Sequence, residues 1–139
     1  MINSRSLDDL HPTVRELCVR FIAECMVDGI DVIITSTYRD NESQAALYAQ
    51  GRTTPGNKVT NAQMGHSFHN YGLAFDFAPL QNGKIDWNNL ELFEKCGQIA
   101  EGVGLEWAGR WSGKMREMAH CQLTSGLTIA QLLNGEMIS

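Results

Sequence analysis

The sequence lacks long apolar runs, a basic surface and paired cysteines, and each absence excludes a class of protein. No apolar run among the 139 residues approaches the roughly 20 that a membrane helix needs. The first six residues lack the apolar stretch of a signal peptide. The net charge of -5 argues against a nucleic-acid partner, because phosphate binding needs a basic face. We therefore expect no membrane partner, no nucleic-acid partner and no signal peptide.

The four cysteines also lack a pattern that would indicate a zinc knuckle or a redox motif. None of them forms a CxxC pair, and Cys18 and Cys25 fall within an apolar helical pattern, as small core residues do. Without an export signal, free thiols in a reducing compartment are the expected state. The 43% hydrophobic and 19% charged residues are typical of a globular protein, and the length predicts a single domain over residues 1–139.

Helices and strands alternate in the predicted secondary structure. Helices are expected over about 12–28, 41–50, 87–103 and 129–133, and strands over 30–36, 72–78 and from about 119. Asn41 and Gln44 resemble a capping box at the start of the second helix, and the strand at 30–36 should be buried. The connections between the later strands are short or loop-like, which favours α+β with a mainly antiparallel sheet flanked by helices. The polar residues 52–66 predict a long loop, a kind of segment that is often functional.

The candidate chemistry lies in and after the strand at 72–78. A histidine and a carboxylate, His69 and Asp76, flank Gly72, which would let the chain turn so that they converge. Neutral imidazole and carboxylate are both zinc ligands, and His120 is the one later histidine that offers a third. Glu117, three residues before His120, stands where a general base for an attacking water belongs. Spacing alone leaves a second interpretation open, in which the histidines are ordinary partly buried residues and Asp76 is a turn or cap residue.

These residues are part of a longer resemblance. The segment Ser67-x-His69-x-x-Gly72-x-Ala74-x-Asp76 matches all five positions of the SxHxxGxAxD signature of the zinc D-alanyl-D-alanine carboxypeptidase and L-alanyl-D-glutamate endopeptidase (VanY-like) family, which includes single-domain phage endolysins. Three further segments resemble the family in the same order: Ser36-Thr37-Tyr38-Arg39 with Gln44, Glu106-Trp107-Ala108-Gly109-Arg110-Trp111, and Glu117-x-x-His120. Together they cover roughly residues 30–123.

The resemblance implies a role for each matched residue. His69, Asp76 and His120 would bind Zn²⁺ and leave a fourth position for water. Glu117 would act as the general base and then as the acid, and Arg39 would hold the scissile carbonyl or its oxyanion. The family also implies a hedgehog-like, D-alanyl-D-alanine-peptidase-like fold.

The sequence departs from the family at the residues that flank the final histidine. Many endolysins have a hydrophobic or proline residue before it and an aromatic residue after it, whereas Ala119 and Cys121 stand here. Adjacent residues of a strand point to opposite sides, so we expect Cys121 to face the core. The same geometry argues against a thiol hydrolase built from Cys121 and His120.

Five further residues are candidates for contact with the substrate or with the metal ligands. Ser67 is expected to be a hydrogen-bond partner rather than a nucleophile, and His66 to be a polar wall of the cleft rather than a ligand. Trp111 either lines a glycopeptide groove or packs in the interior. Gln44, on the second helix, and Tyr71, within the signature, complete the set.

The resemblance implies a monomeric zinc peptidase that cuts the peptidoglycan stem peptide at the L-alanyl-D-glutamate bond. One alternative is a D-alanyl-D-alanine carboxypeptidase or dipeptidase, which would need an additional cation for the terminal carboxylate. The other is a non-catalytic zinc-binding module, against which Glu117 and Arg39 argue, because a structural site needs neither a base nor an oxyanion cation. An endolysin would be held in the host cytoplasm before its release and would act on peptidoglycan in the periplasm.

Overall fold

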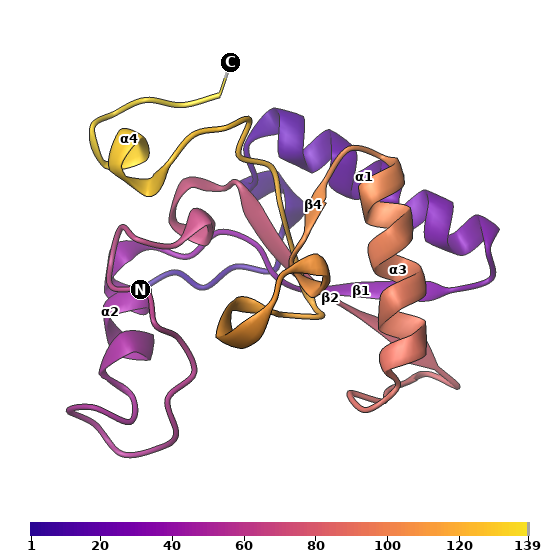
Figure 1. The fold of residues 1–139 in the computed structure, drawn as a ribbon, viewed down its shortest axis with the longest axis horizontal. Helices are drawn as coiled ribbons and strands as arrows, with labels where there is room; N and C mark the ends of the chain where they lie inside the picture. Colours follow the sequence, from indigo (N-terminus) through magenta and orange to yellow (C-terminus); the bar gives the residue numbers. More distant parts are fainter. Residues whose placement is uncertain (139) are drawn as a thin grey trace.

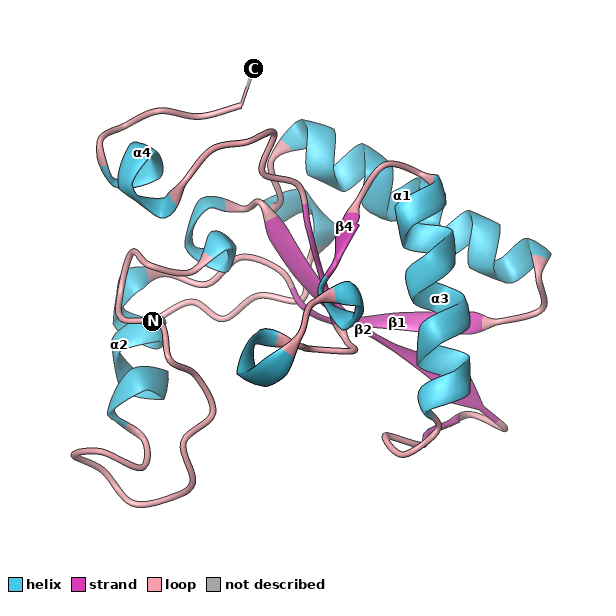
Figure 2. Ribbon diagram, viewed as in Figure 1, coloured by secondary structure: helices cyan, strands magenta, loops and turns pink. Residues whose placement is uncertain are grey.

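One antiparallel sheet organises the computed structural model, which describes residues 1–138. Its strands are β1 (Asp31–Ser36), β2 (Ala74–Gln81), β3 (Lys84–Ile85), β4 (Glu106–Trp107) and β5 (His120–Gln122). They are ordered β1-β2-β5-β4, with β3 paired to β2 as a hairpin, and every one of these pairings is antiparallel (Figures 1 and 2). The predicted α+β class with an antiparallel sheet is confirmed.

Two long helices cover one face of the sheet. Two shorter helices lie at the side of the molecule away from them. The helices are α1 (Pro12–Val27), α2 (Asn41–Ala49), α3 (Leu90–Gly102) and α4 (Ile129–Leu133). The helices α1 and α3 pack against each other and against the strands, whereas α2 and α4 lie on the far side of the molecule (Figure 1). None of the helices within residues 1–138 has the length and apolar character needed to cross a membrane.

The core lies between the sheet and the pair α1 and α3. Phe21 of α1 packs against two β2 side chains, with ring centroids 5.7 Å from Phe75 and 5.1 Å from Phe77. Phe93 of α3 lies 5.8 Å from Phe77 on the other side. All four cysteines are buried as free thiols, and Cys121 faces this core as predicted.

Several predicted boundaries are wrong by a few residues, for identifiable reasons. The cap of α2 is Asp40 and not Asn41, because the Asp40 carboxylate accepts the Ser43 N–H at 2.8 Å and the Ile2 N–H at 2.8 Å. The strand β2 begins at Ala74 rather than at 72, because Gly72 ends a preceding 3₁₀ helix with φ +69°.

Other elements differ from the prediction in burial or extent. The strand β1 is at the edge of the sheet and most of its side chains are only half-buried, so the prediction of a buried strand is wrong. The helix α3 begins at Leu90 rather than at 87, because Asn89 caps it. The strands β3 and β4, of two residues each, were not predicted.

Candidate active site

Three side chains of the predicted ligand set meet at the centre of the sheet. Asp76 and His120 stand opposite each other in the β2–β5 ladder, which places their side chains on the same face. Asp76 Oδ1 lies 3.1 Å from His120 Nδ1 and 3.3 Å from His69 Nε2. One ligand atom from each residue lies within 4.8 Å of the other two, so a single metal ion fits between them.

The turn that brings His69 back to Asp76 is a short 3₁₀ helix, Phe68–Tyr71. The Ser67 hydroxyl caps this helix by accepting the His69 N–H at 3.2 Å, and Gly72 closes it in the left-handed conformation. The ring of His69 is oriented by a contact on the nitrogen that faces away from Asp76: its Nδ1 lies 2.7 Å from the Thr37 carbonyl oxygen. A carbonyl only accepts, so Nδ1 carries a proton and Nε2 is the ring nitrogen that faces Asp76, at 3.3 Å from Oδ1.

His120 is held in a similar way, but with its nitrogens exchanged. Its Nε2 lies 2.8 Å from the Gln122 amide oxygen, and its Nδ1 faces Asp76. The next residue, Cys121, points into the core, because side chains alternate along β5. Cys121 is therefore absent from the cavity, and a thiol mechanism has no nucleophile there.

The charge of the site is distributed unevenly. Burial alone would raise the pKa of Asp76, but hydrogen bonds from His120 and His69 outweigh it and hold that pKa well below its usual range. Burial lowers the pKa of His120, yet the Asp76 carboxylate more than compensates and the net shift is upward. Asp76 is thus an anion that two imidazoles share, which is the charge pattern that a divalent cation would find favourable.

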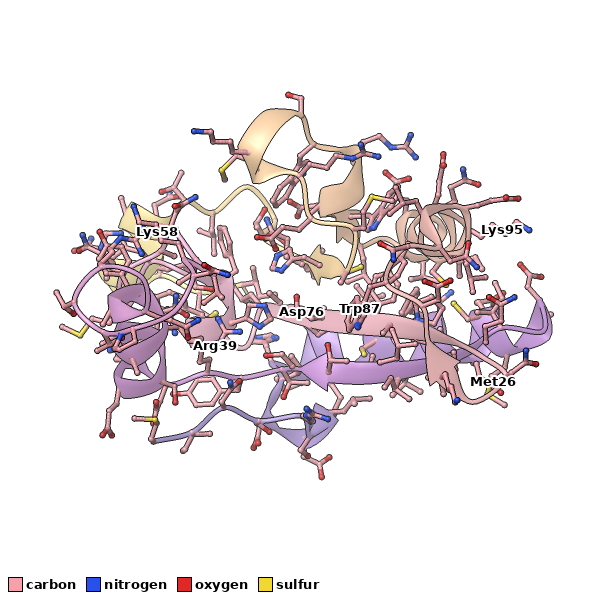
Figure 3. The ribbon with its side chains drawn as sticks, turned by 90° about the horizontal axis from the view of Figure 1, so that it is seen from below. Met26, Arg39, Lys58, Asp76, Trp87 and Lys95 are labelled. Carbon is pink, nitrogen blue, oxygen red and sulfur yellow. The ribbon has the colours of Figure 1, made fainter. Side chains whose placement is uncertain are left out.

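Arg39 lies beside this cluster and is fixed by several contacts. Its Nη1 donates to the Gln44 amide oxygen at 2.9 Å and its Nη2 to the Ser36 hydroxyl at 3.3 Å. Its backbone N–H donates to the His69 carbonyl at 3.1 Å. Among residues 1–138 its buried Nε has no hydrogen-bond partner. Figure 3 labels Arg39 on the side of Asp76 where β2 begins.

Burial lowers the pKa of Arg39, and the nearby carboxylates of Asp76 and Glu117 oppose that shift. A guanidinium keeps its proton in proteins, so Arg39 stays cationic. The sequence pointed to this residue through the resemblance to the family. It did not anticipate that Gln44, which is fully buried in α2, is the acceptor that orients it.

Glu117 lies close to the cluster without belonging to it. Its Oε2 is 3.8 Å from His120 Nδ1, and its side chain is 63% exposed. Its backbone N–H donates to the Ala108 carbonyl at 3.2 Å, which ties the end of this loop to the segment after β4. The carboxylate therefore stands next to the ligand atoms and faces the solvent side of the site.

A cavity of about 460 Å³ opens over these residues. Besides the polar residues of the site, its lining contains large apolar side chains, those of Leu47, Val59, Phe68, Trp111, Met115 and Ile129. Residues 59–62 of the predicted long loop form one wall, so that loop does reach the site. Lys114 also lines the cavity and supplies a second cation besides Arg39.

The remaining candidates fall into two groups. His66, Ser67 and Trp111 line the cavity, and the Trp111 ring centroid is 6.0 Å from that of His120. Tyr71 does not line this cavity, so its contact with the substrate or with the metal ligands stays a prediction. Its hydroxyl donates to the Gly65 carbonyl at 2.6 Å.

Sequence reasoning missed three contributors to the site: the Thr37 carbonyl, Gln122 and Lys114. A backbone carbonyl leaves no signal in a sequence. Gln122 did leave one, because a residue two positions after a ligand on a strand must share its face. Lys114 lies in a short 3₁₀ turn, Gly113–Met115, whose position over the cavity depends on the fold.

The donor set itself tests whether a metal suits this site. Two imidazole nitrogens and one carboxylate oxygen converge, and each imidazole could offer a lone pair to an ion in its neutral form, because its other nitrogen faces an acceptor that can take the remaining proton. Three such ligands leave open positions on a tetrahedral or five-coordinate ion, as in catalytic metal sites. The residues therefore fit a metal ion.

Comparisons with known proteins agree with this site. The family model described as VanY, D-alanyl-D-alanine carboxypeptidase, matches residues 7–119. The peptidoglycan L-alanyl-D-glutamate endopeptidase CwlK of Bacillus subtilis is 41% identical over 130 residues, covering 83% of this chain and 74% of its own. An L-alanyl-D-glutamate peptidase of Escherichia phage T5 is 42% identical over 65 residues, covering 41% of this chain and 47% of that protein.

A solved structure extends the comparison to the fold. The vancomycin-resistance D,D-pentapeptidase VanY, from a VanB-type cassette and in complex with Zn(II), superposes with a TM-score of 0.60. It is 16% identical, and the match covers 90% of this chain and 84% of that one. At this identity the likeness concerns the arrangement of helices and strands.

Proposed function

The chain belongs to the VanY family of D-alanyl-D-alanine carboxypeptidases, and we propose that it hydrolyses the L-alanyl-D-glutamate bond of the peptidoglycan stem peptide with the help of zinc. The observation that carries the proposal is the convergence of His69, Asp76 and His120 in one cavity with Arg39 and Glu117. The 41% identical Bacillus relative, whose name states this specificity, supports the choice of bond. The ligand types and the Zn(II) complex of the similar VanY structure support zinc.

The three ligands would hold the ion at the floor of the cavity, His69 through Nε2, His120 through Nδ1 and Asp76 through its carboxylate. When bound, Zn²⁺ supplies Lewis acidity and lowers the pKa of a bound water to about 7. Because two of these ligands are neutral imidazoles, the site keeps a net positive charge that favours the developing negative charge of the tetrahedral state.

Arg39 binds the oxygen of the scissile carbonyl. Two of its nitrogens are committed to Gln44 and Ser36, so the guanidinium cannot swing away when the substrate arrives. Removing one donor of this kind typically lowers the rate by about 10²–10³. The fixed cation therefore stabilises the oxyanion without a cost for reorganisation.

Glu117 moves the proton. Its carboxylate accepts a proton from the attacking water and then gives it to the departing amine of the D-glutamyl residue. The exposed position of the side chain suits this, since it must reach both the water and the leaving nitrogen. His120 lies three residues away and keeps Glu117 next to the ligand atoms.

Glu117 also provides the sharpest test of the proposed chemistry. We expect Glu117→Ala to fold, to retain one zinc ion and to lose turnover by about 10² or more. Glu117→Asp should keep partial activity, because the carboxylate survives with a shorter reach. Glu94→Ala, an exposed carboxylate on α3, is the matched control and should change neither property. Loss of zinc from Glu117→Ala would make it a ligand, and full activity would place the base elsewhere, with His66 as the next candidate.

The ligand assignment is tested separately. His120→Ala should abolish both zinc retention and hydrolysis, because three protein ligands leave none to spare. A strong chelator should remove activity and added Zn²⁺ should restore it, whereas thiol alkylation should leave the metal chemistry intact. Hydrolysis in a fully demetallated sample would contradict the zinc mechanism.

A D-alanyl-D-alanine carboxypeptidase is the second candidate, favoured by Lys114. A carboxypeptidase needs a cation for the terminal carboxylate, and Lys114 lines the cavity together with Arg39. Mass spectrometry of products from a defined pentapeptide muropeptide separates the two. Endopeptidase action yields the disaccharide bearing L-alanine, whereas carboxypeptidase action releases D-alanine alone.

The biological setting that we favour is that of a phage endolysin, supported by the relative from Escherichia phage T5. A monomeric enzyme would remain in the host cytoplasm and reach the peptidoglycan of the periplasm once a separate protein permeabilises the membrane. Cytoplasmic expression should then leave cells intact until the inner membrane is permeabilised. Lysis without permeabilisation, or dimers in sedimentation experiments, would contradict these two parts of the proposal.

A further inference from the structure

Lys114 is a positive side chain of the cavity that the proposed mechanism does not use. It lines the same cavity as Arg39, Asp76 and Glu117. Arg39 is already committed to fixed partners through both of its terminal nitrogens. Among residues 1–138, in contrast, the ammonium of Lys114 forms no ion pair with a carboxylate. Its charge is therefore available to a ligand that enters the cavity.

The backbone that carries Lys114 is anchored, although its side chain is exposed. The residue belongs to the 3₁₀ turn Gly113–Met115, and the Arg116 backbone N–H that follows donates to the Gly113 carbonyl at 3.3 Å. The Arg116 side chain reaches the Gly109 carbonyl, to which its Nε donates at 3.1 Å. The segment 113–117 is thus held against the segment after β4. A fixed backbone with a free ammonium suits a group that meets its partner from solvent.

The position of Glu117 indicates which part of a substrate lies against this segment. In the proposed mechanism Glu117 gives its proton to the leaving nitrogen, so the leaving half of the substrate lies beside it. Lys114 precedes Glu117 by three residues and lines the same cavity. In an α-amino acid the carboxyl group is attached to the carbon that bears the nitrogen. A free α-carboxylate on the leaving residue therefore stays close to both Glu117 and Lys114.

The D-glutamyl leaving group has such a carboxylate. Glutamate has two carboxyl groups, and only one of them can carry the rest of a stem peptide. In a γ-linked glutamate the group left over is the α-carboxylate, which is an anion when free and neutral when it is converted to a carboxamide. An ammonium is a compact point charge, so it attracts the anion and gains little from the amide.

We propose that Lys114 is a specificity-determining residue, which binds the free α-carboxylate of the D-glutamyl leaving group and makes the enzyme prefer stem peptides that carry this carboxylate over those that carry a carboxamide. The inference rests on the proposed hydrolysis and deepens it, because it names the class of stem peptide. A terminal D-alanine presents the same group beside its nitrogen. Product analysis, and not Lys114, therefore decides which bond is cut.

Lys114→Met tests the proposal, because it keeps the length of the side chain and removes its charge. The substrates are two defined muropeptides that differ only in the α-carboxylate or α-carboxamide of their glutamate. The ratio of their kcat/KM values measures the preference, including any part that is due to the metal or to Arg39. We expect Lys114→Met to lower this ratio about 5- to 20-fold, through a higher KM for the carboxylate substrate and with zinc content unchanged.

Two further variants separate a specific contact from a general effect of charge. Lys114→Arg keeps the cation and should retain most of the preference. Lys95→Met removes the same charge from an exposed lysine on α3, which Figure 3 labels away from Arg39, and should leave the ratio within twofold. Raised salt should weaken the preference of the wild-type enzyme and leave that of Lys114→Met nearly constant, because the contact is open to solvent.

The possible outcomes each decide something. An unchanged ratio in Lys114→Met, or an equal loss of kcat/KM on both substrates, overturns the proposal. The same loss in Lys95→Met overturns it too, since net charge alone would then explain the effect. If the wild-type enzyme does not cut the L-alanyl-D-glutamate bond, the proposed function fails. Calorimetry with the product peptide that begins with D-glutamate, in its carboxylate and carboxamide forms, still tests Lys114 in that case, because it requires no turnover.

Discussion

The support that Gln44 gives to Arg39 leads to the most quantitative prediction. Gln44 is fully buried, accepts from Arg39 Nη1 at 2.9 Å and donates to the Ala62 carbonyl at 2.7 Å. Gln44→Met keeps the volume and removes both bonds. Both bonds are part-buried, and a hydrogen bond contributes about 0.5–1.5 kcal/mol net, so the loss of the two should lower the free energy of unfolding by about 1–3 kcal/mol.

The effect on catalysis follows from the loss of Arg39 orientation. The cation remains in Gln44→Met but keeps only its side-chain bond to Ser36, and a misplacement of about 1 Å can cost about 10² in rate. We therefore expect kcat to fall about 10- to 100-fold, with zinc stoichiometry unchanged. Gln44→Glu separates the two effects, because a carboxylate still accepts from Arg39 but cannot donate to Ala62. It should recover most of kcat and little of the stability.

Gln50→Met is the matched control for these experiments. Gln50 follows α2 and donates to the Asn57 carbonyl at 2.9 Å, so it ties down the same loop without touching Arg39. It should lower stability by less than about 1.5 kcal/mol and leave kcat within twofold. The assays are urea unfolding, zinc content and steady-state hydrolysis of a defined muropeptide. The reasoning is refuted if Gln44→Met unfolds at lower urea but retains wild-type kcat, because Gln44 would then support the loop alone.

Three further predictions concern packing, substrate contact and pH. A Cβ on Gly97 would clash with the Trp107 ring, so Gly97→Ala should lower the free energy of unfolding, measured in urea, by about 2 kcal/mol or more. Gly102→Ala on the same helix is the control: a Cβ has open space there, so this variant should be neutral or stabilising. Trp111→Ala should raise KM about tenfold without loss of zinc, since it removes an apolar wall of the cavity. The backbone N–H of Ser43, at the start of α2, holds the pKa of Asp40 below its usual range. The contribution of Asp40 to the free energy of unfolding is therefore present above its pKa in the unfolded chain and is lost as pH falls through its lower pKa in the folded protein. The stability difference between wild type and Asp40→Ala should shrink in acid, and a difference that grows would contradict this.

The sequence predicted those features that depend on neighbouring residues. The helix α1 was placed to within one residue, because Pro12 begins it and Gly29 follows its end. The cap of α2 was misplaced, because Asp40 and Asn41 are both capping residues and the choice depends on Ile2, which reaches Asp40 from a distant part of the chain. The two-residue strands β3 and β4 are too short to show a period.

In the site too, features set by neighbouring residues were predictable and features set by distant parts of the chain were not. The separation of seven residues between His69 and Asp76 looks wrong for a straight strand, and a motif was needed to pair them. The structure explains the spacing through a 3₁₀ helix and a left-handed Gly72 that reverse the chain before β2 begins. The supports behind the ligands, Thr37 and Gln122, depend on which strands lie next to one another, and that information is tertiary.

The parts of this site differ in how firmly they are held, and the difference matches the proposed chemistry. His69 and His120 are buried, and each is oriented by a partner that does not depend on the metal. Arg39 is fixed by side-chain and backbone bonds. Glu117, in contrast, is exposed and is tied through its backbone. Ligands and an oxyanion donor gain from rigidity, because they act at one position, whereas a group that takes a proton from water and delivers it to a leaving nitrogen must serve two positions. The fold therefore leaves freedom at the one residue whose proposed role requires it.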